Sequence, residues 1–379
     1  MKILFITHDS SYTGAPIVFL HLINELISKY SVDGDILTLE NGPLDEKFKN
    51  ALTLIKEKPL SSFRKNYHRI LRFAGIAEKN DEQLPKYDLA PTYDLIYCNS
   101  VVTAKIIPEL KAKFNCPIIL HVHELQISIE QFAGIEVFNK ALPHVDVFIA
   151  ASKAVSDNLI KLAITENKVK IVHESVPVIK KNINPLDQET LNIWKKNNYF
   201  IVGGSGTTDW RKGTDLFLYT AKKLSKTEPN IRFIWVGGYI HSVEYKRIQY
   251  EVRKLGIEHL IYFTGPVTNP NDYYDLFDLF FLTSREDPFP LVCLENALLS
   301  KPVLCFEGSG GIPELVKEFS DCLIPFGSIE DSCNRIIMFK ENDNKRKLIG
   351  ESLKLKVENE FNIGKMAEKV MAILKKEMK

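Results

Sequence analysis

At 379 residues, with 45% hydrophobic and 26% charged residues, the chain is long enough for two globular domains of ordinary size. Its formal net charge of +1 gives no global excess of charge that would favour nucleic acid as a partner, so any basic surface has to be local. Six widely spaced cysteines, never arranged as Cys-x-x-Cys, argue against a disulfide framework and a zinc site and indicate buried thiols in a reducing compartment.

The first half of the chain alternates short apolar runs with helical patterns. Residues 3–7 are apolar on both faces, which is typical of a central parallel strand, and residues 17–26 repeat apolar side chains at helical spacing. Further strands are expected at residues 35–39, 95–98, 117–122 and 145–150. This succession predicts a doubly wound α/β domain over residues 1–178.

The loop between the first strand and the first helix contains Gly14 and Ala15, two small residues at the start of the helix. Such residues let backbone amides at the positive helix end approach an anion closely. A simple tight turn explains them equally well. Asp33-Gly34-Asp35, before the second expected strand, is interpreted as a turn, and we assign no metal site to it.

Residues 60–73, from Leu60 to Phe73, mix basic and apolar side chains and contain no acidic residue. A basic helix with an apolar face can lie on an anionic membrane or bind an anionic acceptor, and a solvated helix face is the alternative. The first residues of the chain turn polar too early for a signal peptide, and no apolar run approaches the roughly 20 residues of a spanning helix. We therefore expect a cytoplasmic protein, with contact to the inner face of the cytoplasmic membrane left open.

Two histidines, His121 and His123, lie at the end of the apolar run 117–122. Side chains at the carboxyl end of a parallel strand point into the crevice where α/β sheets bind ligands. Because the two residues are spaced for opposite faces of a strand, we expect His123 to face the crevice and only one of the pair to do so.

Residues 179–198 are polar, contain proline and lose hydrophobic periodicity, which predicts a linker between domains. A second alternation follows over residues 199–362, with strands expected at 200–203, 233–237, 260–264, 279–282, 303–306 and 322–325. The chain thus contains two successive Rossmann-like domains with parallel sheets. Residues 363–379 form an amphipathic helix that suits either domain.

The loop of residues 205–213 joins the first strand of the second domain to its helix and contains Arg211 and Lys212. Two cations at a helix N-terminus are disfavoured by the helix dipole unless an anion is bound there. A bound diphosphate would account for them, and a solvated basic turn is the alternative.

Residues 284–297 follow the expected strand 279–282 and contain Asp287 and Glu295. Pro288 keeps Asp287 out of helical geometry, and Pro290 suits the first turn of a helix. The pair of carboxylates could accept hydrogen bonds from sugar or ribose hydroxyl groups. Alone, the two residues could equally be ordinary features of a helix start.

Taken in order, these segments resemble the retaining glycosyltransferases of family 4, which have the two-domain GT-B fold. The strongest part is residues 284–313, where Asp287-x7-Glu295 falls on the family's Glu-x7-Glu motif and Gly310-Gly311-Ile312-Pro313-Glu314 follows. Arg211-Lys212-Gly213 is similar to its Lys-Gly phosphate loop, Thr13-Gly14-Ala15-Pro16 to its glycine loop, and His123 to its cleft histidine. The chain departs from the family at Asp287, where the family has Glu, and at Ser205, where it has an arginine.

The resemblance implies a role for each matching residue. The second domain would bind a nucleotide-diphosphate sugar and the first domain the acceptor. Arg211, which would replace the missing arginine, and Lys212 would hold the diphosphate. Glu295 would hold the ribose, and Asp287 and His123 would contact the sugar. The backbone of Gly14 and Ala15 would approach the donor, and the backbone of Phe289, Pro290 and Leu291 would approach the sugar. Pro266 and Val267 would lie beside the base.

The expected function is therefore transfer of a sugar, with retention of configuration, to a glycan or lipid-linked acceptor in cell-surface polysaccharide biosynthesis. The resemblance implies that neither a metal nor another cofactor is needed, because fixed cations and helix amides stabilise the departing diphosphate. Two alternatives stay open from the sequence: a nucleotide-sugar epimerase of the same fold, and a non-catalytic sugar-nucleotide sensor.

Overall fold

A computed structural model describes residues 1–56, 84, 87–178 and 189–378. The chain forms two compact units, the first comprising Met1–Ala150, Ser156–Val172 and Ala367–Lys379 and the second Ala151–Val155 and His173–Met366. The expected basic segment 60–73 and residues 179–188 of the expected linker lie outside the described residues. Residues 189–196 of that linker form a helix, α8 (Glu189–Lys196), whose Leu191 and Trp194 are buried in the core of the second unit.

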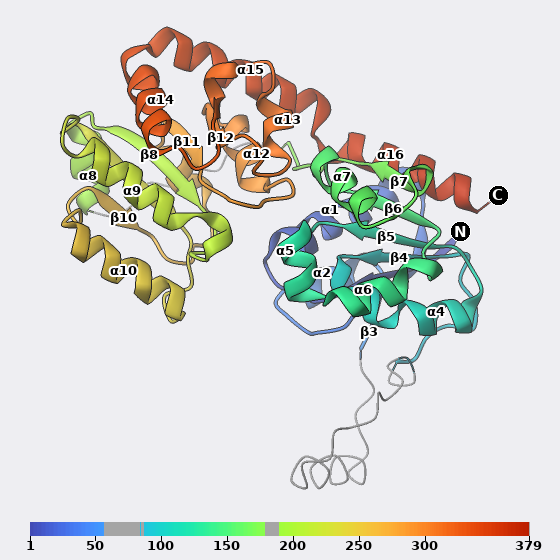
Figure 1. The fold of residues 1–379 in the computed structure, drawn as a ribbon. Helices are drawn as coiled ribbons and strands as arrows, with labels where there is room; N and C mark the ends of the chain where they lie inside the picture. The colour runs from blue at the N-terminus through green and yellow to red at the C-terminus, as the bar shows by residue number, and fades with distance from the viewer. Residues whose placement is uncertain (57–83, 85–86, 179–188, 379) are drawn as a thin grey trace, which may run out of the picture. The chain divides into compact units, whose positions relative to one another are not determined.

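The first unit contains a parallel sheet of seven strands in the order β3-β2-β1-β4-β5-β6-β7 (Figure 1). The central strands β4 and β5 are buried along their whole length, as expected for apolar runs with helices on both faces. The strands are β1 (Lys2–Thr7), β2 (Asp33–Thr38), β3 (Thr53–Ile55), β4 (Leu95–Asn99), β5 (Ile118–Val122), β6 (Val147–Ala150) and β7 (Val169–Ile171). The helices that follow them are α1 (Gly14–Tyr30), α2 (Asp45–Ala51), α4 (Ile107–Phe114), α5 (Gln126–Phe132), α6 (Ile135–Ala141) and α7 (Lys153–Lys161), with 3₁₀ turns η2 (Val101–Ile106), η3 (Leu142–His144) and η4 (Glu166–Lys168).

The second unit contains a parallel sheet of six strands in the order β10-β9-β8-β11-β12-β13 (Figure 1). Its strands are β8 (Phe200–Ser205), β9 (Ile231–Val236), β10 (Ile261–Phe263), β11 (Leu279–Leu282), β12 (Val303–Phe306) and β13 (Leu323–Ile324). Its other helical elements are η5 (Trp210–Lys212), α9 (Thr214–Leu224), α10 (Val243–Leu255), α11 (Asn271–Tyr274), α12 (Leu291–Leu298), α13 (Ile312–Val316), η6 (Ser320–Cys322), α14 (Ile329–Glu341) and α15 (Asp343–Glu360). The last helix, α16 (Ile363–Glu377), begins in this unit and continues into the first.

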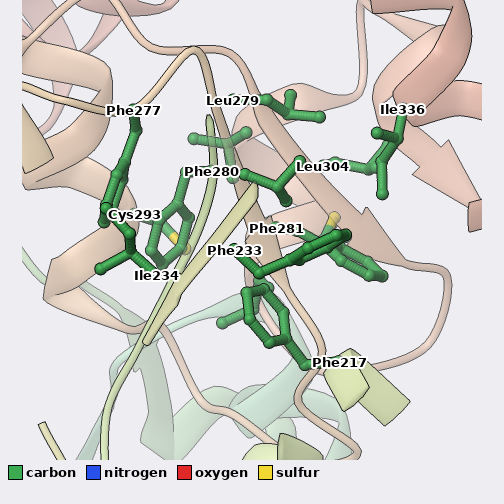
Figure 2. Close-up of a cluster of buried hydrophobic side chains, with 14 of the residues drawn as sticks. Phe217, Phe233, Ile234, Phe277, Leu279, Phe280, Phe281, Cys293, Leu304 and Ile336 are labelled. Atoms are coloured by element: carbon green, nitrogen blue, oxygen red, sulfur yellow. The ribbon is translucent and has the colours of Figure 1, made fainter. Parts of the chain in front are cut away.

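The core of the second unit is built from aromatic side chains between the sheet and its helices (Figure 2). Phe217 of α9 is fully buried and meets the rings of Phe233 and Trp235 at centroid distances of 5.2 Å. Phe277 and Phe280 stack with their centroids 6.4 Å apart. Edge-to-face and offset contacts of this kind stabilise a core beyond the area that they bury.

The two Rossmann-like parallel sheets confirm the expected fold class, and all six cysteines are buried and unpaired as expected. The sequence reading missed β3 and β7, which have three residues each and lie at the two edges of their sheet, because so short a run shows no clear period. It was wrong at Asp33-Gly34-Asp35, which opens β2 instead of forming a turn. A Cβ on Gly34 would lie 1.9 Å from the backbone oxygen of Ile3, so glycine serves here to let two strands meet. Among the described residues, no helix combines the length and apolar character needed to cross a membrane.

We predict that Gly203→Ala destabilises the second unit, because an added Cβ would lie 2.0 Å from the ring of buried Phe277. Overpacking of this kind is expected to lower the free energy of unfolding by about 3 kcal/mol. Urea denaturation followed by tryptophan fluorescence measures it, since Trp194, Trp210 and Trp235 all belong to this unit.

The matched control is Gly256→Asn, at the left-handed cap of α10, where φ is 63° and nothing lies within 4 Å of an added Cβ. Asparagine tolerates that conformation, so the control should change the free energy of unfolding by less than about 1 kcal/mol. Equal destabilisation by both variants would contradict the packing explanation.

Candidate functional site

The sheet of the second unit changes its direction of growth between β8 and β11, which are adjacent although three strands apart in sequence. In open α/β sheets, ligands bind at the carboxyl ends of the strands beside such a switch point. The loops that leave β8 and β11 there are residues 206–213 and 283–290, which carry the basic pair and the first carboxylate singled out above.

These two loops are joined by hydrogen bonds to the backbone carbonyl oxygens of Lys212 and Arg211. The hydroxyl of Thr283 donates a hydrogen bond of 3.0 Å to the carbonyl oxygen of Lys212, and the amide of Arg285 donates one of 2.7 Å to that of Arg211. Gly213 has φ of 66°, and a Cβ there would lie 2.0 Å from the carbonyl oxygen of Thr283. Glycine is therefore required for both the left-handed conformation and the close approach.

Asp209 shapes the turn that presents the two cations. Its carboxylate accepts hydrogen bonds from the amide of Lys212 at 3.0 Å and the hydroxyl of Thr207 at 2.7 Å, which caps the 3₁₀ turn η5. The sequence reading missed this residue, although an aspartate before a helical turn is a known capping signal.

The side chains of Lys212 and Arg211 converge on the buried carboxylate of Asp287. The Nζ atom of Lys212 lies 2.6 Å from Oδ2, which also accepts a hydrogen bond of 2.9 Å from Ser284, and Nη1 of Arg211 lies 3.5 Å from Oδ1. Burial alone raises the pKa of Asp287, but the charges of Lys212 and Arg211 outweigh it, so the net effect is a pKa below the usual value. The carboxylate is thus held ionised among its cations.

Arg285 stabilises the contact between the two loops through a second ion pair. Its guanidinium pairs with both carboxylate oxygens of Asp215, at 2.9 and 2.6 Å, and donates a hydrogen bond of 2.8 Å to the carbonyl oxygen of Trp210. The bidentate pair joins the first turn of α9 to the loop after β11. No motif in the sequence marked Arg285 or Asp215, because the contact spans 70 residues.

The turn of residues 287–290 packs on the glycines that follow β12. The amide of Asp287 donates to the carbonyl oxygen of Ser309 at 2.7 Å, and the amide of Gly311 donates to that of Asp287 at 3.1 Å. A Cβ on Gly310 would lie 1.8 Å from the carbonyl oxygen of Asp287, and one on Gly311 would lie 2.2 Å from that of Pro288. The Gly310-Gly311 pair is therefore required to hold the turn in place.

The second carboxylate of the motif, Glu295, stands apart from the first. It is half-buried on α12, and it has no hydrogen bond or ion pair with any residue in the described part of the chain. Burial raises its pKa to about 7. A carboxylate without a protein partner among the described residues is suited to accept hydrogen bonds from a ligand.

The remaining donor-binding candidates of the second unit follow strands β11 and β10 of its sheet. Phe289 is buried and stacks on Phe361, and Pro290 leads into α12, which begins at Leu291. Two further candidates follow β10, which lies two strands from β8, namely the exposed Pro266 and the half-buried Val267.

Ser205, at the family's arginine position, is buried at the end of β8 and shares a hydrogen bond of 2.8 Å with the hydroxyl of Tyr274. A large cation would not replace a side chain so placed without displacing Tyr274. Arg211, the candidate substitute for that arginine, has its charge beside Asp287.

In the first unit, His123 lies just after β5, beside the switch point between β1 and β4. Its Nε2 atom is 2.7 Å from Oδ1 of Asn99, whose Nδ2 donates a hydrogen bond of 3.3 Å to the carbonyl oxygen of Ala15. His121 is fully buried, with Nδ1 2.8 Å from the hydroxyl of Tyr97, and burial together with the nearby His123 holds its pKa well below the usual value.

Asn99 was missed by the sequence reading, and it connects two of the predicted residues, His123 and Ala15. Because the carbonyl oxygen of Ala15 can only accept, Asn99 must direct its NH₂ group there and its Oδ1 atom toward His123. The Nε2 atom of His123 therefore carries a proton. Gly14, which opens α1, has nothing within 4 Å of the position of a Cβ, so its backbone is accessible from that side.

Comparison with known proteins gives the family. The model described as Glycosyltransferase Family 4 matches residues 12–178, and the model described as Glycosyl transferases group 1 matches residues 187–356. The chain is 27% identical over 257 residues to alpha-galactosylglucosyldiacylglycerol synthase of Streptococcus pneumoniae, which covers 63% of this chain and 66% of that protein. It is 22% identical over 381 residues to the O-antigen biosynthesis glycosyltransferase WclY of Escherichia coli. This match covers 97% of this chain and 96% of that protein.

Solved structures share the fold at low sequence identity. Anabaena HepE, in complex with UDP and glucose, superimposes with a TM-score of 0.77 at 19% identity and covers 99% of both chains. Sucrose-phosphate synthase of Thermosynechococcus elongatus gives a TM-score of 0.75 at 17% identity and covers 99% of this chain and 98% of its own. The two-domain GT-B fold expected from the sequence is thereby confirmed. Since the two family models match one unit each and together span nearly the whole chain, the protein belongs to the family 4 glycosyltransferases.

Proposed function

We propose that this glycosyltransferase moves a sugar, with retention, from a nucleotide-diphosphate sugar to a glycan or lipid-linked acceptor in cell-surface polysaccharide biosynthesis. The observation that carries the proposal is the contact of Lys212 and Arg211 with buried Asp287 beside the switch point of the second sheet. Relatives named for O-antigen and glycolipid synthesis support the acceptor class. The UDP and glucose bound to HepE support the donor class.

The cations would act on the leaving group. Negative charge grows on the diphosphate as the glycosidic bond breaks, and fixed positive charges at Lys212 and Arg211 stabilise it without reorganisation. Asp287 holds the ammonium of Lys212 through Oδ2, and its Oδ1 atom keeps acceptor capacity for a sugar hydroxyl. The paired carboxylate thus serves as an anchor for the cations and as a ligand for the sugar.

Other candidates complete the proposed donor site. Glu295 accepts hydrogen bonds from the ribose hydroxyls, which provide the partners that it lacks among the described residues. His123 contacts the transferred sugar. The bond between the anomeric carbon and the diphosphate breaks, the departing phosphate oxygen takes the proton of the acceptor hydroxyl, and the acceptor oxygen bonds to the anomeric carbon on the same face. No protein nucleophile takes part in this proposal, and the cations of Lys212 and Arg211 serve in place of a metal. The proposed backbone contacts to the donor come from Gly14, Ala15, Phe289, Pro290 and Leu291, with Pro266 and Val267 beside the base.

The reaction itself is tested on the donor alone. A thermal-shift screen of UDP-, GDP- and dTDP-sugars selects the donor, because a ligand that binds the native state raises its melting temperature. Proton NMR of slow donor hydrolysis should then show that the sugar first released has the anomeric configuration of the donor, at a rate unchanged by excess EDTA. Release of the opposite anomer or loss of the reaction in EDTA would contradict the proposal. Conversion of the donor to a different nucleotide sugar would identify an epimerase. Binding of a donor without turnover, even with added glycan acceptors, would identify a sensor.

We predict that Lys212→Ala lowers both stability and donor affinity. The variant leaves the buried carboxylate of Asp287 with Arg211 at 3.5 Å as its nearest cation, which should lower the free energy of unfolding by about 2–3 kcal/mol. Loss of a charge-assisted contact to the diphosphate should weaken donor binding roughly 30-fold, or about 2 kcal/mol. Urea denaturation and titration calorimetry measure the two effects.

The double variant Lys212→Ala with Asp287→Asn separates these effects. Removing the stranded charge should restore most of the stability while donor affinity stays low. The exposed Lys226 provides the control, and Lys226→Ala should change neither quantity. If the double variant bound donor as tightly as the unaltered chain, Lys212 would have no role at the diphosphate.

We predict that donor affinity rises with pH through the pKa of Glu295, which is about 7 in the free protein. The ionised carboxylate accepts hydrogen bonds from both ribose hydroxyls, so binding favours the deprotonated form, and affinity falls as pH drops below about 7. Calorimetry with UDP-glucose suits this test if UDP-sugars bind, since its diphosphate diester does not titrate in this range.

Glu295→Gln should bind more weakly and show no such pH dependence. Glu286→Gln, which changes a carboxylate outside the motif, is the control and should retain the dependence of the unaltered chain. A pH profile that is the same in Glu295→Gln and the unaltered chain would exclude Glu295 as the titrating group.

A further inference from the structure

Helix α10 of the second unit has an outer side that packs against no other element described in that unit. Helix α10 buries Ile248 and Val252 on its inner side, and the ring of Tyr245 on that side meets Phe263 at 5.9 Å. The helix is capped by Ser242 at its start and by Gly256 after its last residue, Leu255, so both termini are defined by local contacts. In Figure 1 it lies at the margin of its unit.

The opposite side of α10 is exposed, basic and partly apolar. At 3.6 residues per turn, one side of the helix carries Val243, Lys246, Arg247, Tyr250, Arg253 and Lys254, and all six are exposed. Val243 is 57% exposed and Tyr250 is 54% exposed, which are large values for side chains of these types. We call these six residues, together with Tyr239 and Ile240, the α10 face.

The charges of the α10 face are unbalanced. None of its four cations forms an ion pair with any residue that the structure describes, and Lys254 instead lies over the ring of Tyr250 at 5.4 Å. The acidic residues of the helix, Glu244 and Glu251, fall on its flank. Glu251 lies near α9, where its charge raises the pKa of Tyr219.

The apolar end of the α10 face adjoins the candidate site. Tyr239 and Ile240 are 61% and 45% exposed in the loop between β9 and α10. That loop begins with Gly237 and Gly238, which pack on the loop after β8: a Cβ on Gly237 would lie 2.6 Å from the carbonyl oxygen of Gly206, and one on Gly238 would lie 2.8 Å from Thr208. The exposed apolar residues are thus held beside the loop that carries Lys212.

We propose that the α10 face docks on an anionic membrane surface. Lys246, Arg247, Arg253 and Lys254 would contact lipid phosphates, and Tyr239, Ile240 and Val243 would enter the headgroup region. Cations without protein partners, alternating with aromatic and aliphatic side chains, suit a lipid surface better than a folded acidic partner, whose carboxylates would leave the apolar tip unmatched. The proposal rests on this surface alone and not on the proposed reaction, so each can fail without the other.

The test is flotation of the full chain with vesicles of phosphatidylcholine containing phosphatidylglycerol, compared with phosphatidylcholine alone. The unaltered chain should bind the anionic vesicles and release them as salt rises. The charge variant carries Lys246→Gln, Arg247→Gln, Arg253→Gln and Lys254→Gln and should bind at least roughly tenfold more weakly. An apolar variant, Tyr239→Ser with Ile240→Ser and Val243→Ser, should also bind more weakly while keeping the same salt dependence.

The matched control changes the net charge equally but elsewhere on the second unit. It carries Lys195→Gln, Lys196→Gln, Lys226→Gln and Lys317→Gln, four exposed lysines without ion pairs in the described part of the chain, and should bind like the unaltered chain. All comparisons are repeated with Arg64→Gln, Arg69→Gln and Arg72→Gln, so that residues 60–73 do not supply the binding.

Three outcomes would overturn the proposal. The first is no binding of the unaltered chain to anionic vesicles at low salt. The second is equal weakening by the control and charge variants, which would indicate a general effect of net charge. The third is unchanged vesicle binding by the charge and apolar variants together with a loss of self-association in sedimentation velocity, which would assign the face to a second copy of the chain.

Discussion

The candidate site depends on a buried negative charge. Asp287 is 4% exposed, and a carboxylate in such surroundings is tolerated only with close cations and hydrogen bonds. Lys212 and Arg211 supply the cations and Ser284 a hydroxyl. Because these partners come from two different loops, the ion cluster fixes the loops after β8 and β11 relative to each other. The backbone contacts between the loops serve the same requirement.

The contacts of Asp287 with Lys212, Arg211 and Ser284 also explain how two adjacent cations are tolerated at the start of a helix. The positive end of α9 disfavours Arg211 and Lys212, and the negative charge of Asp287 offsets that cost. A diphosphate would then enter a site whose positive charges are already oriented, which is the condition for electrostatic stabilisation of a leaving group. Arg285 restricts the motion of the loop after β11 through its bidentate pair with Asp215, which would reduce the conformational entropy that a ligand bound at this loop costs.

The loop after β9 connects this site to the outer surface of the second unit. Gly237 and Gly238 pack against the loop that carries the cations, and the chain then exposes Tyr239 and Ile240 before entering α10. A sugar acceptor attached to a lipid has to meet the donor near a membrane surface. If the loop of residues 206–213 binds the donor as proposed, an exposed basic and apolar face next to it is the arrangement that such an acceptor would require.

The sequence by itself determined the two parallel sheets, because doubly buried strands read as continuous apolar runs and most strand positions follow from them. It also singled out Arg211, Lys212, Asp287 and His123 as candidates, from their places at strand ends and from the resemblance to the family. Only the tertiary structure revealed Asn99 and the pair Arg285–Asp215, and only it showed that Asp287 contacts the cations while Glu295 does not. The physical reason is that local periodicity encodes which face of a strand or helix is buried, whereas hydrogen bonds and ion pairs between loops depend on which strand ends the fold places side by side.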